Sequence, residues 1–418
     1  MPQYGYGGIS PDQKLEMAAC VLLLSAAKNG EDYPMITKLF MRSASSERCT
    51  SVAGESSRLN HLKVIAFYTL LPLFLFVGVS EALLNTTPVI RFLNTYQPDR
   101  IKVSLNVRSE AQVLRLVSES RAELPGIAFI GSSSVANGID EKAVAQVWEE
   151  IGLSQRPVNL GITGLMASEL AMLSPYLLSD GYEAVVFLYN SFSFSDELQE
   201  YVVSRGRMDI FLEIATRHNI ERAMDQLPEM LISDLLFVSR YRHYLGNLVK
   251  RAGLGQLEPP EHLYDYATGR RPDGRRARNG DKWPDLPADS WQRRIYTTSV
   301  QQDDTIGYRG FEYFLRAAAN AGLKVIVMAV PEPEFSAYTG FKRGLDTKRV
   351  DVRVEHLSRK YNAIFIPHST VGHLEARDEL FRDPVHLNDT GRDLYSDYLA
   401  KILAPLIENP TVTMDRRK

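Results

Sequence analysis

The chain has 418 residues, of which 44% are hydrophobic and 24% are charged, and its formal net charge at pH 7 is −3. This length has room for about two domains, or for one large domain with appendages. The composition is ordinary for a globular chain, and the small negative charge gives no reason to expect a nucleic-acid partner. Both cysteines, Cys20 and Cys49, lie near the N-terminus, so the sequence offers no disulfide framework.

Residues 1–60 are expected to form a helical appendage followed by a serine-rich linker. Residues 10–13 resemble a capping box with proline at the first helical position, and the helix that they open would end before Gly30. The stretch 43–57 is rich in serine, which is typical of a linker. A small cytosolic appendage, or an incorrectly assigned start of the chain, explains this region as well as any function does.

An apolar run predicts a membrane-spanning helix at residues 62–85. Residues 64–80 contain no charged side chain, and the run approaches the roughly 17–25 residues that cross a bilayer core when residues 82–84 are included. Pro72 would kink this helix without preventing insertion. The alternative is a helix buried in the protein's own core, which would need cover on every side.

The charges that flank this run indicate its orientation. Arg58 and Lys63 precede the run closely, whereas Arg91 is the only close basic residue after it. Because basic flanks stay in the cytosol, this slight bias favours a cytosolic N-terminus. We therefore expect a single-pass protein of the inner (cytoplasmic) membrane, with the domain that follows in the periplasm or outside the cell. The opposite orientation would leave that domain in the cytosol.

Alternating strand and helix patterns at 105–407 predict an α/β domain with a parallel sheet between helices. Helices are expected at 110–124, 167–178, 308–320 and 349–361, and a final helix follows that Asn388 or Asp389 can cap. Residues 193–305 interrupt the pattern as a largely helical insertion, which would stand near the rim of the ligand crevice. Residues 408–418 form a tail. Strands are expected at 127–130, 158–160, 184–189, 324–330 and 363–366.

Two stretches far apart in the sequence carry the candidate chemistry. In residues 126–138 an apolar strand breaks at a glycine into three serines, and in residues 382–391 Asp383 and His386 stand three positions apart before the final helix. A carboxylate can fix the tautomer of a histidine whose other ring nitrogen then takes the proton of a hydroxyl. The two stretches together therefore predict an activated serine nucleophile.

These two stretches and two others resemble the blocks of the SGNH, or GDSL-type, hydrolases. Residues 131–133, Gly-Ser-Ser, match the first block, so the resemblance makes Ser133 the candidate nucleophile. Gly164 falls at the glycine of the second block, and Asn190, at the end of the third strand, at the asparagine of the third. Asp-x-x-His before the final helix fills the last block. The four blocks arrive in the family's order.

The resemblance has two departures. Ser132 stands where the family usually has an aspartate before the nucleophile, although some membrane-anchored relatives also begin this block with Gly-Ser-Ser. The third block reads Leu-Tyr-Asn-Ser at 188–191 in place of the family's Gly-x-Asn-Asp. A subunit that keeps the fold but is catalytically silent is therefore an alternative to an enzyme.

The resemblance implies a flavodoxin-like three-layer α/β/α SGNH-hydrolase fold with a five-stranded parallel sheet. It also implies that Ser133 attacks an ester carbonyl while His386, oriented by Asp383, takes the proton. The backbone N–H groups of Ser133 and Gly164 and the side-chain amide of Asn190 would form the oxyanion hole. Water as the acceptor gives an esterase, and a sugar or polyol hydroxyl gives an O-acyltransferase.

Anchored, exported relatives often act on acyl groups of cell-envelope polymers, some of them beside a multispanning acyltransferase. The resemblance thus implies an acylated glycan or a lipid-linked molecule as the substrate and such an acyltransferase as a partner. Two alternatives stay open: a silent binding or assembly subunit of an envelope polysaccharide modification system, and a soluble cytosolic lipase-like enzyme. No cofactor is expected. No metal is expected either, because His368 and His373 have no third ligand at a convincing spacing.

Overall fold

Five apolar segments form the strands of one parallel sheet in the structure, which is a computed structural model. It describes residues 77–94, 105–120, 126–179, 181–194, 208–223, 232–233, 236–254, 304–332, 347–375, 377–383 and 386–408. The strands are β1 (Gly126–Gly131), β2 (Arg156–Asn159), β3 (Tyr182–Tyr189), β4 (Lys324–Ala329) and β5 (Ile364–Ile366). Their order across the sheet is β2-β1-β3-β4-β5, and all four pairings are parallel. The predicted α/β class and five-stranded parallel sheet are confirmed.

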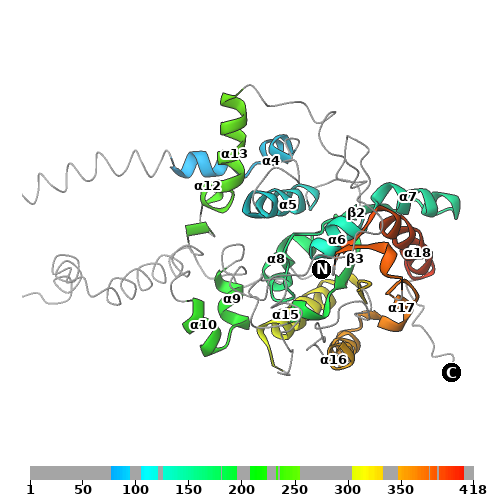
Figure 1. Cartoon of the computed structure of the whole chain (residues 1–418). Coiled ribbons are helices and arrows are strands. Elements are labelled where there is room, and N and C mark those ends of the chain that lie inside the picture. Colours follow the sequence, from blue (N-terminus) through cyan, green and yellow to red (C-terminus); the bar gives the residue numbers. More distant parts are fainter. Residues whose placement is uncertain are drawn as a thin grey trace, which may run out of the picture.

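Helices cover both faces of this sheet, which makes the fold a three-layer one (Figure 1). Alternate strand residues enter two separate cores, such as Ala128 and Phe187 on one face and Phe129 and Val186 on the other. Strands buried on both faces read as continuous apolar runs, and these segments have that pattern. One face packs against α5 (Leu105–Glu119), α8 (Glu169–Leu177), α15 (Ile306–Ala321) and α16 (Thr347–Lys360). The other packs against α6 (Ser133–Gly138), α7 (Glu141–Glu150), α17 (Gly372–Glu375) and α18 (Asp389–Glu408).

Trp148 joins the sheet, α7 and α18 into one unit on the second face. Its ring stacks on Phe129 of β1, with the centroids 6.1 Å apart, and its indole N–H donates to the carbonyl of Ala400 at 3.0 Å. The side chain is completely buried. This contact fixes α18, whose N-terminus carries the second candidate stretch, against the strand that carries the first.

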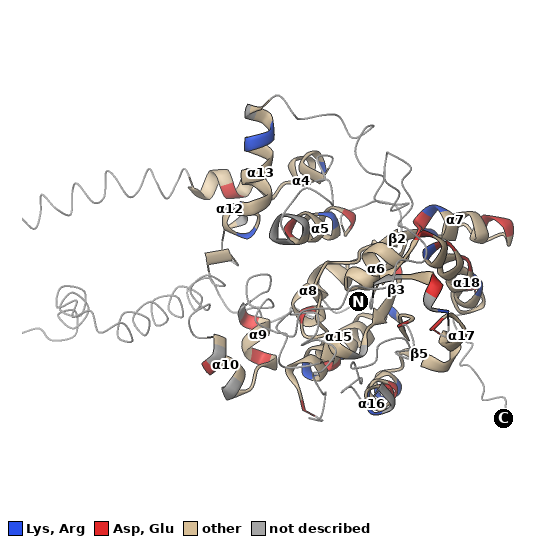
Figure 2. Ribbon diagram, viewed as in Figure 1, with Lys and Arg blue, Asp and Glu red and all other residues tan. Residues whose placement is uncertain are grey.

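Smaller helices lie beside this domain. They are α4 (Thr87–Asn94), α9 (Met208–Ile214), α10 (Arg217–Ala223), α12 (Phe237–Arg240) and α13 (Arg242–Gly253), with the 3₁₀ turns η1 (Ser191–Phe194), η5 (His368–Thr370) and η6 (Asp378–Leu380). From the insertion, α9 packs against α8 and α15, and α13 packs against α5. Most of the charged residues that the structure describes lie on the helices, and few lie on the sheet (Figure 2).

The predicted membrane span at 62–85 lies mostly outside the described residues. Residues 77–84 are described, and they form a helix that leads through a turn into α4. In the part of the chain that the structure describes, no helix has the length and apolar character needed to cross a bilayer. The appendage at 1–60 and the tail from residue 409 also lie outside the described residues.

Candidate active site

The first candidate stretch makes a sharp turn from β1 into α6. A side chain at Gly131 would collide with the carbonyl of Leu188 and with Val135, so only glycine fits where the strand ends. Ser132 is the N-cap of α6, and its hydroxyl accepts the N–H of Ser134 at 3.4 Å. Ser133 is consequently the first residue of the helix and stands at the carboxyl end of β1, the edge where open α/β sheets bind ligands.

His386 meets this serine. Its Nε2 lies 2.8 Å from the Oγ of Ser133, although the two residues are 253 positions apart in the sequence. Both residues are half-buried. A separation of about 2.6–3.2 Å is what a general base needs to take a hydroxyl proton. The structure therefore brings together the two residues that the sequence predicts as nucleophile and base.

A short antiparallel ladder and a helix cap hold His386 in place. The ladder pairs β6 (Phe381–Asp383) with β7 (His386–Leu387), and it was not predicted. Asn388 follows directly. Its backbone N–H donates to Leu380 at 2.8 Å, and its side-chain oxygen accepts the N–H of Gly391 at 2.9 Å, which caps α18. Of the two residues predicted to cap this helix, Asn388 does so.

Asp383 lies directly opposite His386 in this ladder. Cross-strand partners have neighbouring Cβ atoms, so the backbone places the two residues side by side. The side chain of Asp383 lies outside the described residues. Its role in orienting the imidazole stays a prediction.

Gly164 lies in a turn that follows β2 along the edge of the sheet. The N–H of Ile162 donates to the carbonyl of Gly131 at 2.9 Å, which continues the β1–β2 pairing, and the N–H of Leu165 closes the turn on Ile162 at 3.0 Å. Gly164 has a φ of 76°, a conformation that favours glycine at this position of a turn. The turn thus stands next to the β1–α6 corner, while the predicted oxyanion role of Gly164 stays a prediction.

Asn190 lies at the same edge, immediately after β3, and is almost completely buried. Its side-chain oxygen accepts the hydroxyl proton of Ser132 at 2.6 Å, and its amide nitrogen donates to Glu332 at 3.0 Å. An amide nitrogen carries two hydrogens, and Glu332 accounts for one of them. The predicted oxyanion role of Asn190 is compatible with these contacts but is not tested by them.

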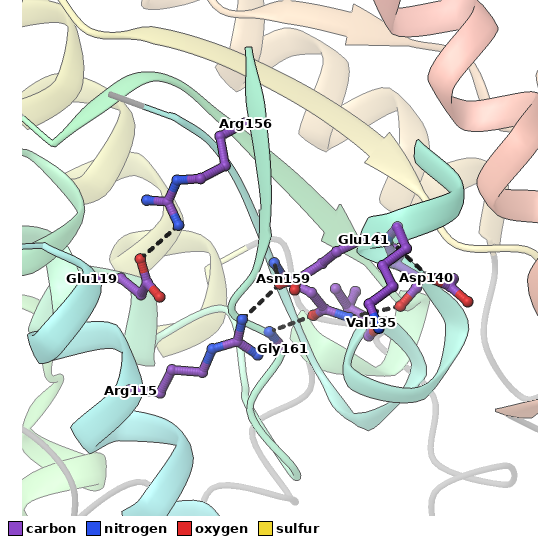
Figure 3. A network of polar contacts seen from close by, with 10 residues as sticks. Arg115, Glu119, Val135, Asp140, Glu141, Arg156, Asn159 and Gly161 are labelled. Atoms are coloured by element: carbon purple, nitrogen blue, oxygen red, sulfur yellow. Dashed lines mark hydrogen bonds and ion pairs between the residues drawn. The ribbon is translucent and has the colours of Figure 1, made fainter. Parts of the chain in front are cut away.

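Asn159 is a site-building residue that the sequence analysis missed (Figure 3). Its side-chain amide donates to the carbonyls of Val135 at 3.1 Å and Ile139 at 3.0 Å, at the far end of α6. Its side-chain oxygen accepts the N–H of Gly161 at 3.0 Å. Asn159 therefore ties the helix that begins with the nucleophile to the strand that leads to Gly164. The available signal was an amide side chain at the end of a buried strand, where a polar group must find partners.

A partly buried ion pair supports the same corner. The carboxylate of Glu141 accepts the backbone N–H of Asn159 and pairs with Arg115 of α5 at 2.7 Å. Beside it, Arg156 pairs with Glu119 at 3.0 Å (Figure 3). Burial alone would lower the pKa of Arg115, but the charges of Glu141 and Glu119 outweigh it and raise that pKa. The start of β2 and the start of α7 are thereby fixed to α5.

A second polar network lies behind Asn190, at the ends of β4 and β5. The backbone N–H of Glu332 donates to a carboxylate oxygen of Glu375 at 2.8 Å, and the same oxygen lies 2.7 Å from Nε2 of His368. Nδ1 of His368 lies 3.6 Å from Asp351, which accepts the hydroxyl of Tyr189 at 2.7 Å.

His368 is the cation of this network. Burial lowers its pKa, but hydrogen bonds and charges of Asp351 and Glu375 outweigh that effect and raise the pKa to about 10. His368 is therefore an imidazolium between two carboxylates at neutral pH. Among the described residues, no group of histidine, cysteine and acidic side chains is arranged to hold a metal ion.

No protein-family model matches the chain, and no curated protein matches its sequence at a significant level. The residues of the four blocks and the geometry of the site are therefore the observations from which a function can be inferred.

Proposed function

We propose that this protein is an SGNH-type serine enzyme that hydrolyses or transfers ester-linked acyl groups. The observation that carries the proposal is the 2.8 Å contact between Oγ of Ser133 and Nε2 of His386. It lies at the carboxyl edge of a five-stranded parallel sheet, at the N-terminus of a helix. A serine–histidine contact that serves only the fold would lie in a buried hydrogen-bond network. Ser133 and His386 are instead half-buried, so they remain within reach of a substrate.

The chemistry proceeds in two steps. In the first, the Ser133 hydroxyl gives its proton to His386 as the oxygen attacks the acyl carbonyl carbon, and the ester's C–O bond breaks. The departing alcohol takes the proton from the imidazolium, which leaves an acyl-enzyme. In the second step, His386 takes a proton from water or from an acceptor hydroxyl as that oxygen attacks the acyl carbonyl carbon. The bond between the acyl carbon and Oγ of Ser133 then breaks, and the imidazolium returns the proton to Ser133.

Three further residues complete the proposal. Asp383, opposite His386 in the ladder, would hold the imidazole in the tautomer that leaves Nε2 free to accept the proton. The N–H of Gly164 and the side-chain amide of Asn190, both at this edge of the sheet, would bind the oxyanion. Losing one such donor typically lowers the rate by about 10²- to 10³-fold.

The substrate class follows from the resemblance and from the predicted membrane span at 62–85. An enzyme anchored beside the bilayer with its domain outside the cytosol meets acylated envelope glycans and lipid-linked molecules. We propose these as substrates, with the inner membrane as the location and a multispanning acyltransferase as a partner.

Hydrolysis of p-nitrophenyl acetate by the full chain tests the proposal. Ser133→Ala and His386→Ala should each lower kcat/KM by at least about 10³-fold, because each removes half of the nucleophile–base pair. Ser179→Ala is the matched control, since among the described residues its hydroxyl bonds the carbonyl of Tyr176 at 2.9 Å, at the end of another helix, and it should leave activity unchanged. Full activity in Ser133→Ala would refute the proposal. A wild-type chain without activity on any acyl ester would favour the silent binding subunit.

A further inference from the structure

The side-chain amide of Asn190 is hydrogen-bonded at both its oxygen and its nitrogen. The residue that bonds the nitrogen, Glu332, has no role in the proposed reaction. Ser132 contacts the amide oxygen at 2.6 Å, and Glu332 contacts the amide nitrogen at 3.0 Å. All three residues are buried, with relative exposures of 1% for Asn190, 3% for Ser132 and 6% for Glu332. Water has little access to this row, so the protein groups themselves decide the direction of each hydrogen bond.

We propose that Glu332 is a positioning residue that fixes the orientation of Asn190 and, through it, of Ser132. An ionised carboxylate only accepts hydrogen bonds, so the atom of Asn190 that faces Glu332 must be the nitrogen. The oxygen of Asn190 then faces Ser132, whose hydroxyl must donate to it. The inference rests on the proposed function, because it assigns Glu332 a part in that same reaction.

The hydrogen-bond direction that Glu332 sets extends to α6, the helix that begins with the nucleophile. Because the proton of the Ser132 hydroxyl is committed to Asn190, the lone pairs of its oxygen remain for the N–H of Ser134 at 3.4 Å. That contact is the side-chain cap of α6, the helix whose first residue is Ser133. One negative charge therefore orders a row of three hydrogen bonds that ends beside the reacting serine.

With the amide of Asn190 in this orientation, its second N–H can donate to an oxygen atom in the active site. If the amide were reversed, its oxygen would face position 332 and Ser132 would have to accept from Asn190 instead of donating to it. The hydroxyl oxygen would then receive two N–H groups, and its own proton would have no acceptor in the row. A carboxylate at 332 excludes that arrangement, whereas a neutral amide at the same place permits both.

The backbone of Glu332, and not only its carboxylate, holds the residue in position. Its backbone N–H donates to Glu375 at 2.8 Å, and the network of Glu375, His368 and Asp351 continues from there to the hydroxyl of Tyr189, the residue next to Asn190. These contacts bind the ends of β3, β4 and β5 to one another. Glu332→Gln leaves these contacts in place and removes the negative charge that faces Asn190.

The test compares steady-state hydrolysis of p-nitrophenyl acetate by the full chain and its variants. Glu332→Gln should lower kcat by about 10- to 100-fold with KM nearly unchanged, since it weakens an oxyanion donor rather than ground-state binding. Glu332→Asp keeps an acceptor with a negative charge and should recover part of that loss. Glu213→Gln, at an exposed ion pair with Arg316, is the matched control and should leave kcat unchanged.

A double-mutant cycle distinguishes positioning from general damage to the fold. If Glu332 acts through Asn190, then Glu332→Gln should cause no further loss of kcat in an Asn190→Ala background. Additive losses would overturn the inference while the proposed function stood, as would an unchanged kcat in Glu332→Gln. A chain in which Ser133→Ala retains full activity would overturn the proposed function and, with it, this inference.

Discussion

Replacing Asn159 by alanine should release the helix that carries the nucleophile. The side chain makes three hydrogen bonds, to the carbonyls of Val135 and Ile139 and from the N–H of Gly161, and only 4% of the residue is exposed. Alanine removes all three bonds at once without adding a group that could replace them.

The size of the effect follows from which groups lose their partner. The carbonyl of Val135 still accepts the N–H of Ile139 at 3.3 Å, so the loss falls mainly on the Ile139 carbonyl and the Gly161 N–H. A buried polar group without a partner costs about 1–3 kcal/mol, which gives a total of roughly 2–6 kcal/mol for the two. Domains are typically stable by about 5–15 kcal/mol, so the variant should unfold at a clearly lower urea concentration.

Urea titration followed by far-ultraviolet circular dichroism measures this difference. Asn85→Ala is the matched control, because the side chain of Asn85 donates to the carbonyl of Glu81 at 2.8 Å in an exposed turn. The control should change the free energy of unfolding by no more than about 0.5 kcal/mol. A loss below about 1 kcal/mol in Asn159→Ala would refute the reasoning that this amide holds α6 in place.

Two further predictions concern stability. The pKa of His368 is about 10 in the folded chain, above the ordinary value of about 6.5. The stability that the protonated imidazole contributes is therefore fully present below a pH of about 6.5 and is lost as the pH rises through about 10. The unfolding free energy of the wild type should therefore approach that of His368→Gln by up to about 1.4 kcal/mol per pH unit in this window, and parallel pH curves in urea titrations would contradict this. A side chain at Gly161 would collide with the backbone of Ala136, so Gly161→Ala should lower the free energy of unfolding by about 1–3 kcal/mol. Gly246→Ala, which meets open space within a helix, should be neutral or stabilising by up to about 1 kcal/mol, and equal thermal shifts in the two variants would argue against the collision.

Continuous apolar runs made the sheet predictable. The expected strands at 127–130, 184–189 and 324–330 correspond to β1, β3 and β4 with ends that differ by at most two residues. Both faces of these strands are buried, so nearly every side chain in them is apolar, and no alternation is needed to recognise them.

Elements with few buried residues were not predicted. Helix α7 buries only Val144 and Trp148, and this leaves a weak periodic signal in the sequence. The ladder of β6 and β7 consists of three and two residues, too few for any period to appear. Both elements matter for the site, because α7 anchors α18 and the ladder carries His386.

The sequence predicted the pair of Ser133 and His386, which the structure brings within 2.8 Å of each other, but it did not predict the residues that surround this pair. Ser133 and His386 could be found because each lies in a short motif with a chemical meaning. Asn159, Glu332 and His368 act through contacts that depend on how separate strands end next to one another. Sequence spacing carries no information on such contacts, so these residues looked like ordinary polar groups.

Covalent labelling of the full chain with a serine-directed fluorophosphonate tests the central claim most directly, because the reagent reacts with a hydroxyl only where a base activates it. Peptide mapping by mass spectrometry should place one adduct on Ser133, and His386→Ala should abolish that adduct. An unlabelled wild-type chain, or an adduct on another serine, would contradict the assignment of Ser133 and His386 as nucleophile and base.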